Sequence, residues 1–275
     1  MQGTELTGTA GRALSIQRSV RGEIPFLRRF GRSLTGEQNL ADLCVIQLME
    51  ELLTEPDCIV ASDNAKVALY RRLLQNLETV AQFNGESLSS ALPTPRSRQA
   101  HLLTMVEGFS CSQAAEVLGV TIPEMDALLQ EARNELTCQT GARILIIEDE
   151  EFIVMHIESL VHQLGHHVVG TAETMDVAVA QARKTRPDLI LSDVNLADGS
   201  SGHDAVQEIL KEQEIPVIFI TAYPERLLTG NCAEPAFLIT KPFRDEAVKA
   251  TITQAHFLSQ RKLGSTARGL EIALP

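Results

Sequence analysis

Residues 143–150 read Arg143-Ile144-Leu145-Ile146-Ile147-Glu148-Asp149-Glu150, a short run of aliphatic side chains followed at once by three acids. Such a run, rich in β-branched residues, is typical of a strand that is buried on both faces. Similar runs recur downstream, at Val168–Thr171, Asp188–Leu191, Val217–Ile220 and Phe237–Ile239. Helix-length stretches lie between or after them, at 152–164, 174–185, 203–213, 224–228 and 244–258. This alternation predicts a doubly wound α/β half with a five-stranded parallel sheet.

Polar side chains directly follow four of these five runs. Glu148 and Asp149 follow the first run, Asp193 the third, Thr221 the fourth and Lys241 the fifth. Because ligands gather beyond the carboxyl ends of parallel strands, we expect these side chains to form one cluster. Converging carboxylates repel one another, and a hard divalent cation relieves that repulsion, so the cluster predicts a Mg²⁺ site. With the hydroxyl and the ammonium beside it, the set fits phosphorylation of Asp193.

This order of residues resembles the receiver domain of bacterial response regulators over residues 142–258. The resemblance implies that Asp193 is the phosphoacceptor and that Glu148, Asp149, Asp193 and the backbone carbonyl of Asn195 hold Mg²⁺. It also implies that Thr221 is the switch hydroxyl and that Lys241 contacts the phosphoryl group. Glu148 departs from the commoner aspartate, and its longer side chain is expected to reach the metal only through water. Tyr223, two residues after Thr221, is either a packed loop aromatic or a second switch residue.

The first 140 residues carry almost no strand pattern and predict an all-helical half. Residues 24–34 place Leu27, Phe30 and Leu34 on one helical face, and three arginines lie mostly off that face, at positions 28, 29 and 32. We interpret these arginines as a solvated face or a contact to the second half rather than as a nucleic-acid patch. Residues 39–53 predict a second helix that ends before Pro56, and Asp63 or Asn64 can cap a third. Residues 84–96 have the composition of a linker.

Residues 98–135 predict a helix-turn-helix. Gly108 can end its first helix, and Ser110 or Ser112 can cap the next. Gly119 can end that second helix. Thr121 and Glu124 then form the pattern of a capping box at the start of the last helix.

The helix-turn-helix is similar to region 4 of an extracytoplasmic-function sigma factor, and Pro25–Leu34 with the following helix is similar to a shortened region 2. A sigma-like half ahead of a receiver is the arrangement of the PhyR family, and the segment Thr221–Leu227 also resembles that family. The resulting division is a region 2-like part at 1–60, a region 4-like part at 61–140, a receiver at 141–260 and a loose tail at 261–275. The fold class expected is therefore multidomain, with an all-α sigma-like half and an α/β receiver.

The resemblance to the PhyR family implies a phosphorylation-controlled anti-anti-sigma factor. Its partners would be an anti-sigma factor of the NepR type, which it sequesters to free a sigma factor for stress transcription, and a sensor histidine kinase that supplies the phosphoryl group. The chain is not expected to be a turnover enzyme, although Asp193 can undergo autophosphorylation from a small donor and slow autodephosphorylation.

The charge of the chain disfavours binding to nucleic acid. It carries 24 Lys and Arg against 36 Asp and Glu, a net charge of −12, which repels phosphate backbones. Between Glu107 and Glu135 the sequence has six acids and one strong base, Arg133, so no direct DNA contact is expected there. The alternative to an anti-anti-sigma factor is a DNA-binding transcriptional response regulator that acts through the helix-turn-helix. A receiver that controls RNA-related termination or an enzyme partner is a third, weaker hypothesis.

Other sequence features indicate no further site. The five cysteines are far apart and lack metal-ligand spacing, which favours reduced thiols over disulfides or zinc. His162 and His166 lie one helical turn apart, but no third ligand is placed to complete a metal site, and Gly165 separates them. No signal peptide or long apolar run is present, so we expect a cytoplasmic protein without a membrane contact.

Overall fold

The computed structural model describes residues 5–54, 64–83, 94–136, 141–196, 198–224, 227–228 and 235–271, and side chains within these ranges except those of 5–19, 81–83, 136 and 262–271. Pro56, the cap candidate Asp63 and most of the expected linker at 84–96 lie outside the described residues. So does part of the helix expected at 224–228. No described helix combines the length and the hydrophobicity needed to cross a bilayer.

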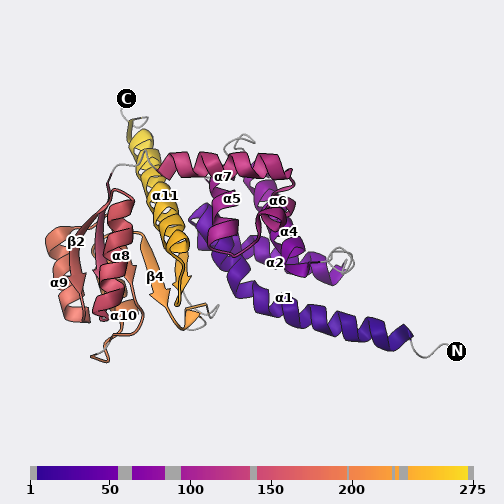
Figure 1. Ribbon diagram of the computed structural model, residues 1–275, viewed down its shortest axis with the longest axis horizontal. Helices are drawn as coiled ribbons and strands as arrows, with labels where there is room; N and C mark the ends of the chain where they lie inside the picture. The colour runs from indigo at the N-terminus through magenta and orange to yellow at the C-terminus, as the bar shows by residue number, and fades with distance from the viewer. Residues whose placement is uncertain are drawn as a thin grey trace.

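The N-terminal half is helical, as the sequence predicts (Figure 1). Its described helices are α1 (Glu5–Thr35), α2 (Gln38–Thr54), α4 (Ala65–Phe83), α5 (Arg96–Met105), α6 (Cys111–Leu118) and α7 (Ile122–Leu136). One hydrophobic core joins all six, and it includes the fully buried Leu27, Phe30 and Leu34 that the pattern of residues 24–34 placed on one face. Asn64 accepts a hydrogen bond from the backbone N–H of Val67 at 3.3 Å, which makes it the cap of α4.

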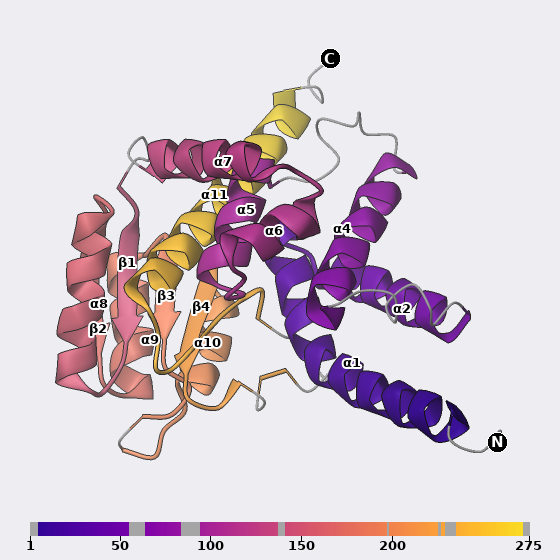
Figure 2. The same ribbon diagram turned by 45° about the vertical axis from the view of Figure 1, so that its right-hand side comes forward.

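Helix α1 is longer than the apolar pattern indicates. The periodic stretch starts near Ile24, whereas the helix begins at Glu5 and carries Pro25 in its interior. The preceding residues are mostly polar, so they carry no apolar stripe that would reveal a helix. Figures 1 and 2 show this N-terminal part extending away from the other helices.

The three arginines of α1 are not a solvated face. Arg28 forms an ion pair of 2.7 Å with Asp42 on α2, and Arg29 forms one of 2.8 Å with Glu107 just after α5. Arg32 is 1% exposed and Arg29 7% exposed, so the solvated-face alternative was wrong for both. The reason is that their acidic partners come from other helices, which a pattern within one helix does not show. Arg29 lines a cavity together with Leu238 and Arg244, which agrees with the other alternative, a contact to the second half. Glu107 itself is buried, and it therefore does not belong to the acidic surface of the helix-turn-helix.

The predicted helix-turn-helix is present as α5, α6 and α7. Ser110 caps α6 in a capping box with Gln113, and Gly119 ends α6 in the left-handed conformation at φ 64°. At the start of α7, the Glu124 carboxylate accepts hydrogen bonds of 2.7 Å from the backbone N–H and the hydroxyl of Thr121. These local contacts fix the angle between successive helices.

The C-terminal half is a five-stranded parallel sheet of order β2-β1-β3-β4-β5 (Figure 2). The strands are β1 (Arg143–Ile147), β2 (His167–Ala172), β3 (Leu189–Ser192), β4 (Val217–Thr221) and β5 (Phe237–Thr240). The helices are α8 (Glu151–Gln163), α9 (Met175–Thr185), α10 (Gly202–Leu210) and α11 (Asp245–Glu271). One core packs α8 and α11 on one face of the sheet, and a second packs α9 and α10 on the other. The doubly wound fold class is confirmed.

Helix α11 belongs to both halves. One side packs on the sheet and α8, and the other packs on α5, as Figure 2 shows. The Gln254 amide donates to the Ser33 carbonyl at 2.8 Å and to the Thr94 hydroxyl at 2.6 Å, and Arg98 donates to the Thr253 carbonyl at 3.3 Å. We name this contact of α11 with residues 33, 94 and 98 and their neighbours on α5 and α7 the seam. The sequence predicts the helix to end near Leu258, whereas α11 continues to Glu271.

Candidate functional site

The acidic residues that follow β1 and β3 meet at one edge of the sheet. Glu148, Asp149 and Asp193 each place a carboxylate oxygen so that all three oxygens lie within 4.8 Å of one another. The meeting follows from the register, because β1 and β3 are neighbouring parallel strands in which Ile147 lies beside Ser192. The cluster that the sequence predicts is therefore formed by the fold.

Lys241 reaches into this cluster from the end of β5. Its ammonium donates to Asp193 Oδ2 at 2.6 Å and to Glu148 Oε2 at 2.9 Å. Glu150 Oε1 lies 3.5 Å from the same ammonium. Glu150 was not among the predicted site residues, although its place directly after the acidic pair was the available signal. One ammonium thus contacts three carboxylates, while Asp149 adds a fourth to the cluster, and the edge of the sheet keeps a negative charge.

Burial and neighbouring charges shift two pKa values in the cluster. Burial is the main cause that raises the pKa of the Glu148 carboxyl, and the Asp193 carboxylate adds to the rise while hydrogen bonds from Lys241 oppose it. For Lys241, burial acts to lower the pKa, but its hydrogen bonds to Asp193 and Glu148 outweigh burial and raise the pKa above the ordinary value. Lys241 is therefore charged at neutral pH and holds the two carboxylates together.

The remaining predicted site residues lie at the end of β4 or just after β3 and β4. The backbone N–H of Asn195 donates to Asp193 Oδ1 at 3.2 Å. Thr221 is fully buried, and its hydroxyl accepts a hydrogen bond of 3.1 Å from the backbone N–H of Tyr223. The Thr221 carbonyl accepts one of 2.8 Å from the Lys241 backbone N–H, which ties the β4 end to the β5 end. The Tyr223 side chain is 48% exposed.

Gly202 is a residue of the site that the sequence pattern did not reveal. Gly202 begins α10, and its N–H donates to the Val194 carbonyl at 3.0 Å. A Cβ at this position would lie 1.9 Å from the Asp193 carbonyl oxygen. Only glycine allows the start of α10 to pack this closely on the backbone of Asp193.

The histidine pair does not form a second cluster of ligands. The buried His166 uses its Nδ1 to accept a hydrogen bond of 3.0 Å from the Ala142 N–H. Among the side chains that the structure describes, Glu148, Asp149 and Asp193 are the one group of three or more acids, histidines or cysteines with the spacing of a metal site.

Known families match the chain in succession. Residues 20–74 match the sigma2 domain of PhyR, residues 91–139 the sigma-like domain of the response regulator PhyR, and residues 144–253 the response regulator receiver domain. The phyllosphere-induced regulator PhyR of Methylorubrum extorquens is 45% identical over 258 residues, which cover 90% of this chain and 96% of the relative. The chain belongs to the PhyR family.

Two crystal structures of PhyR proteins have the same arrangement. The response regulator PhyR from Brucella abortus is 42% identical, has a TM-score of 0.81 and covers 92% of this chain and 99% of its own. The anti-anti-sigma factor PhyR from Bartonella quintana is 40% identical, has a TM-score of 0.83 and covers 91% and 99%. The sigma-like half followed by the receiver is therefore the PhyR arrangement in this chain as well.

Proposed function

We propose that the chain is a phosphorylation-activated anti-anti-sigma factor. Phosphorylation of Asp193 weakens the seam, and the freed sigma-like helices bind an anti-sigma factor of the NepR type, which releases a sigma factor for stress transcription. The observation that carries the proposal is the gathering of Asp193 with two further carboxylates and Lys241 at the edge of the sheet. The Bartonella quintana PhyR is described as an anti-anti-sigma factor, and it has been crystallised with the anti-sigma factor NepR.

The acidic cluster fits a Mg²⁺ ion. Its oxygen donors are the kind that hard divalent cations prefer, and the single ammonium of Lys241 leaves the carboxylates of the cluster incompletely neutralised. Glu148, Asp149, Asp193 and the Asn195 carbonyl would hold the ion. Bound there, Mg²⁺ supplies charge neutralisation for a phosphoryl group. Because Glu148 already bonds Lys241 through both carboxylate oxygens, we assign it a contact to the metal through water.

The chemistry at Asp193 is a phosphoryl transfer. One oxygen of the Asp193 carboxylate attacks phosphorus, a new O–P bond forms, and the bond from phosphorus to the histidine nitrogen of a kinase or to the oxygen of a small donor breaks. Lys241, already 2.6 Å from Asp193, is placed to pair with the added negative charge. In slow autodephosphorylation, water attacks the same phosphorus, the O–P bond to Asp193 breaks, and inorganic phosphate leaves while the carboxylate is restored.

The start of α11 offers a route from the site to the seam. Three residues after Lys241, Arg244 donates a hydrogen bond of 2.8 Å to the Met105 carbonyl at the end of α5. A phosphoryl group on Asp193 that repositions the Lys241 ammonium therefore also acts on the segment that carries this bond. Thr221, bonded through its carbonyl to the Lys241 backbone, moves with the same segment, and Tyr223 follows it. We assign Thr221 and Tyr223 to the switch on this basis.

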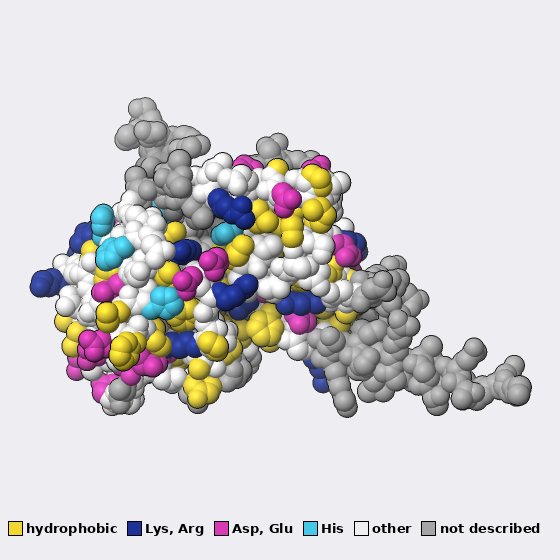
Figure 3. Space-filling model, in the orientation of Figure 1, with side chains coloured by type: hydrophobic (Ala, Val, Ile, Leu, Met, Phe, Trp, Pro, Cys, Tyr) yellow, Lys and Arg dark blue, Asp and Glu magenta, His cyan; other side chains and the backbone are white. Residues whose placement is uncertain are grey.

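The surface of α6 and α7 suits a protein partner better than DNA. Four acids are exposed there, namely Glu116, Glu124, Asp126 and Glu131. Ile122 is 47% exposed among them, and Figure 3 shows acidic and hydrophobic side chains next to one another over these helices. Such a surface repels phosphates and favours a partner that carries basic and apolar residues.

The deciding experiment compares two ligands. Purified protein, with and without a small phosphodonor and Mg²⁺, is mixed with a fluorescent anti-sigma factor of the NepR type and, separately, with labelled promoter DNA across a salt series. We expect binding of the anti-sigma factor that the phosphodonor strengthens, and unchanged mobility of the DNA. A salt-sensitive mobility shift without anti-sigma binding would favour the transcription-factor alternative.

Replacing Asp149 by asparagine tests the metal proposal. Loss of one anionic ligand is expected to weaken Mg²⁺ binding by at least about 10-fold and to slow phosphorylation of Asp193 at limiting Mg²⁺. Titration calorimetry with MgCl₂ measures the first effect. Asp204→Asn, which removes an exposed carboxylate on α10, is the matched control and should bind Mg²⁺ as the parent does. Equal affinities for all three proteins would contradict the assignment of Asp149.

A further inference from the structure

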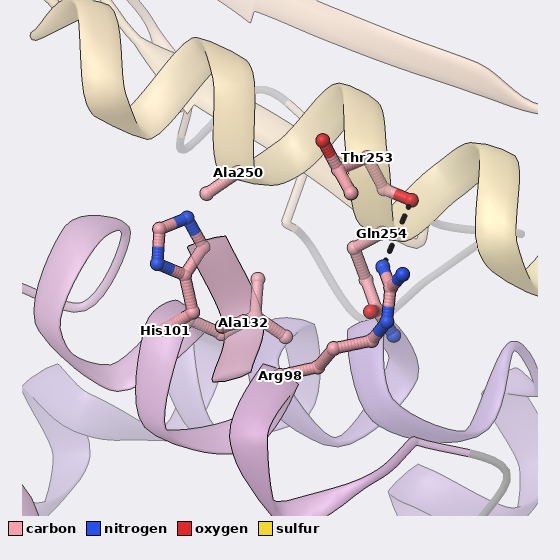
Figure 4. A pocket seen from close by; sticks show the side chains of 7 residues that line it. Arg98, His101, Ala132, Ala250, Thr253 and Gln254 are labelled. Atoms are coloured by element: carbon pink, nitrogen blue, oxygen red, sulfur yellow. Dashed lines mark hydrogen bonds between the residues drawn. The ribbon is translucent and has the colours of Figure 1, made fainter. Parts of the chain in front are cut away.

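The seam contains a half-buried histidine, His101, whose Nε2 atom is fully buried. Figure 4 shows the His101 ring of α5 turned toward Ala250 of α11, at a cavity of about 10 Å³ that Ala132 and Thr253 also border. No described residue forms a hydrogen bond with the His101 Nε2 atom. The cavity offers room for about one water molecule at most, so the ring packs mainly against other side chains.

The charged groups around His101 are two arginines and one carboxylate that is already paired. Arg98 lies on its own helix, and α7 contributes Arg133. The Glu135 carboxylate of α7 is already paired, because it forms an ion pair of 2.8 Å with Arg98 Nε and accepts a hydrogen bond of 3.1 Å from the Ser97 hydroxyl. A proton on His101 would therefore meet two guanidinium groups and no uncommitted carboxylate among the described neighbours.

Helix α11 supplies no compensating charge. Ala250 and Thr253 are neutral, and Gln254 is held by its own amide bonds to Ser33 and Thr94, so that Figure 4 places its side chain beside Arg98 rather than beside the histidine ring. The titratable groups of α11 nearby face the receiver. Lys249 donates to Gln163 at 2.8 Å, and His256 packs on His166 with ring centroids 5.5 Å apart.

We propose that His101 is a proton sensor in the seam, and that its protonation separates α5 and α7 from α11 without a phosphoryl group on Asp193. The proposal rests on the proposed function, because the opened seam is the state assigned there to anti-sigma binding. Acidification would then be a second input to the same output, one that acts on the seam directly rather than through the receiver site.

The size of the effect follows from the two environments of the ring. Burial first, and then the charges of Arg133 and Arg98, lower the pKa of His101 to about 4 in the closed seam. In an opened seam the ring is solvated and returns to its ordinary pKa near 6.5. The closed state is thus fully favoured above pH 6.5 and loses stability as pH falls toward 4. Between pH 8 and pH 5 the opening equilibrium shifts roughly 30-fold toward the open state.

The test uses the full chain carrying Asp193→Asn, which removes the phosphorylation input. Hydrogen exchange of α5 and of the middle of α11 is measured from pH 8 to pH 5, corrected for the intrinsic pH dependence of exchange, with and without His101→Gln. We expect protection across the seam to fall roughly 30-fold at pH 5 in the histidine protein and to stay constant in the glutamine variant. Equal losses in both proteins would overturn the proposal.

Two further measurements test the role of His101 independently of the glutamine variant. An NMR titration of the unsubstituted chain reports the His101 pKa directly, and a value above 6 in the closed protein would also overturn the proposal, even if the glutamine variant failed to fold. His203→Gln, which changes a histidine outside the seam, is expected to open with acid as its parent does. Because hydrogen exchange needs no anti-sigma factor, failure of the proposed function would appear separately, as an opened seam that does not bind the partner.

Discussion

Asp193→Asn is expected to abolish phosphoryl uptake and, with it, the dependence of anti-sigma binding on a phosphodonor. The amide keeps the shape of the carboxylate and its place beside Lys241, so the fold is retained, but its oxygen is a poor nucleophile toward phosphorus. Intact-protein mass after incubation with a small phosphodonor and Mg²⁺ should show one added phosphoryl group on the unsubstituted protein and none on the variant.

The matched control is Asp198→Asn, in the loop that follows β3. Asp198 is exposed and bonds to the backbone N–H of Ser200 at 2.9 Å, so it shares the neighbourhood of Asp193 without reaching the cluster. It should take up one phosphoryl group at the rate of the unsubstituted protein. Full phosphoryl incorporation into the Asp193→Asn protein would remove Asp193 from the mechanism.

Gly202→Ala is expected to lower the free energy of unfolding, whereas Gly22→Ala is not, because Gly22 has open space around it and no positive φ. The Cβ added at Gly202 would lie 1.9 Å from the Asp193 carbonyl oxygen and 2.7 Å from the Ser192 hydroxyl, and the first of these belongs to the backbone and cannot rotate away. The start of α10 must move off β3, at a cost of about 3 kcal/mol in the free energy of unfolding. Because Asp193 moves with it, phosphoryl uptake should fall as well.

Gly22→Ala provides the comparison for this prediction. Gly22 lies in α1 with nothing within 4 Å of the added Cβ, so alanine there should raise the free energy of unfolding by up to about 1 kcal/mol through helix propensity. Urea denaturation of both variants gives the two free energies. If the Gly202→Ala protein were as stable as its parent, the start of α10 would be able to shift and accommodate the methyl group, and the prediction would be wrong.

The site was predictable because it depends on one rule of topology. In a parallel sheet the carboxyl ends of all strands share an edge, so the residues after each apolar run must meet once the runs are recognised as strands. Asp149, Asp193 and Lys241 each lie two residues after the end of such a run, and the strand boundaries shift by at most one residue from the expected ones. Caps such as Ser110 and Thr121 were predictable for a similar reason, since their partners lie three residues away.

The contacts that could not be predicted from the sequence join residues that are far apart in the chain. From the sequence alone, Arg29 looks like a surface residue. In the fold, α1 packs against the end of α5, where Arg29 forms an ion pair with Glu107 and the Tyr70 hydroxyl donates a hydrogen bond to the same carboxylate. The carboxylate of Glu148 likewise points to Lys241, 93 residues away, and Gly202 is required only because α10 starts against β3. A hydrophobic repeat within one helix or strand does not predict such contacts, because ion pairs and close backbone approaches depend on tertiary geometry.

Helix α11 has a consequence for how the whole protein melts. Its residues Val248 and Ile252 complete the core beneath the sheet, while Gln254 and Thr253 hold residues of α1 and α5. If either half unfolded while α11 stayed intact, the surface of the other half that it had covered would become exposed. Calorimetry of the dephosphorylated protein should therefore record one cooperative endotherm, and phosphorylation should split it into two, each belonging to a half that now unfolds by itself.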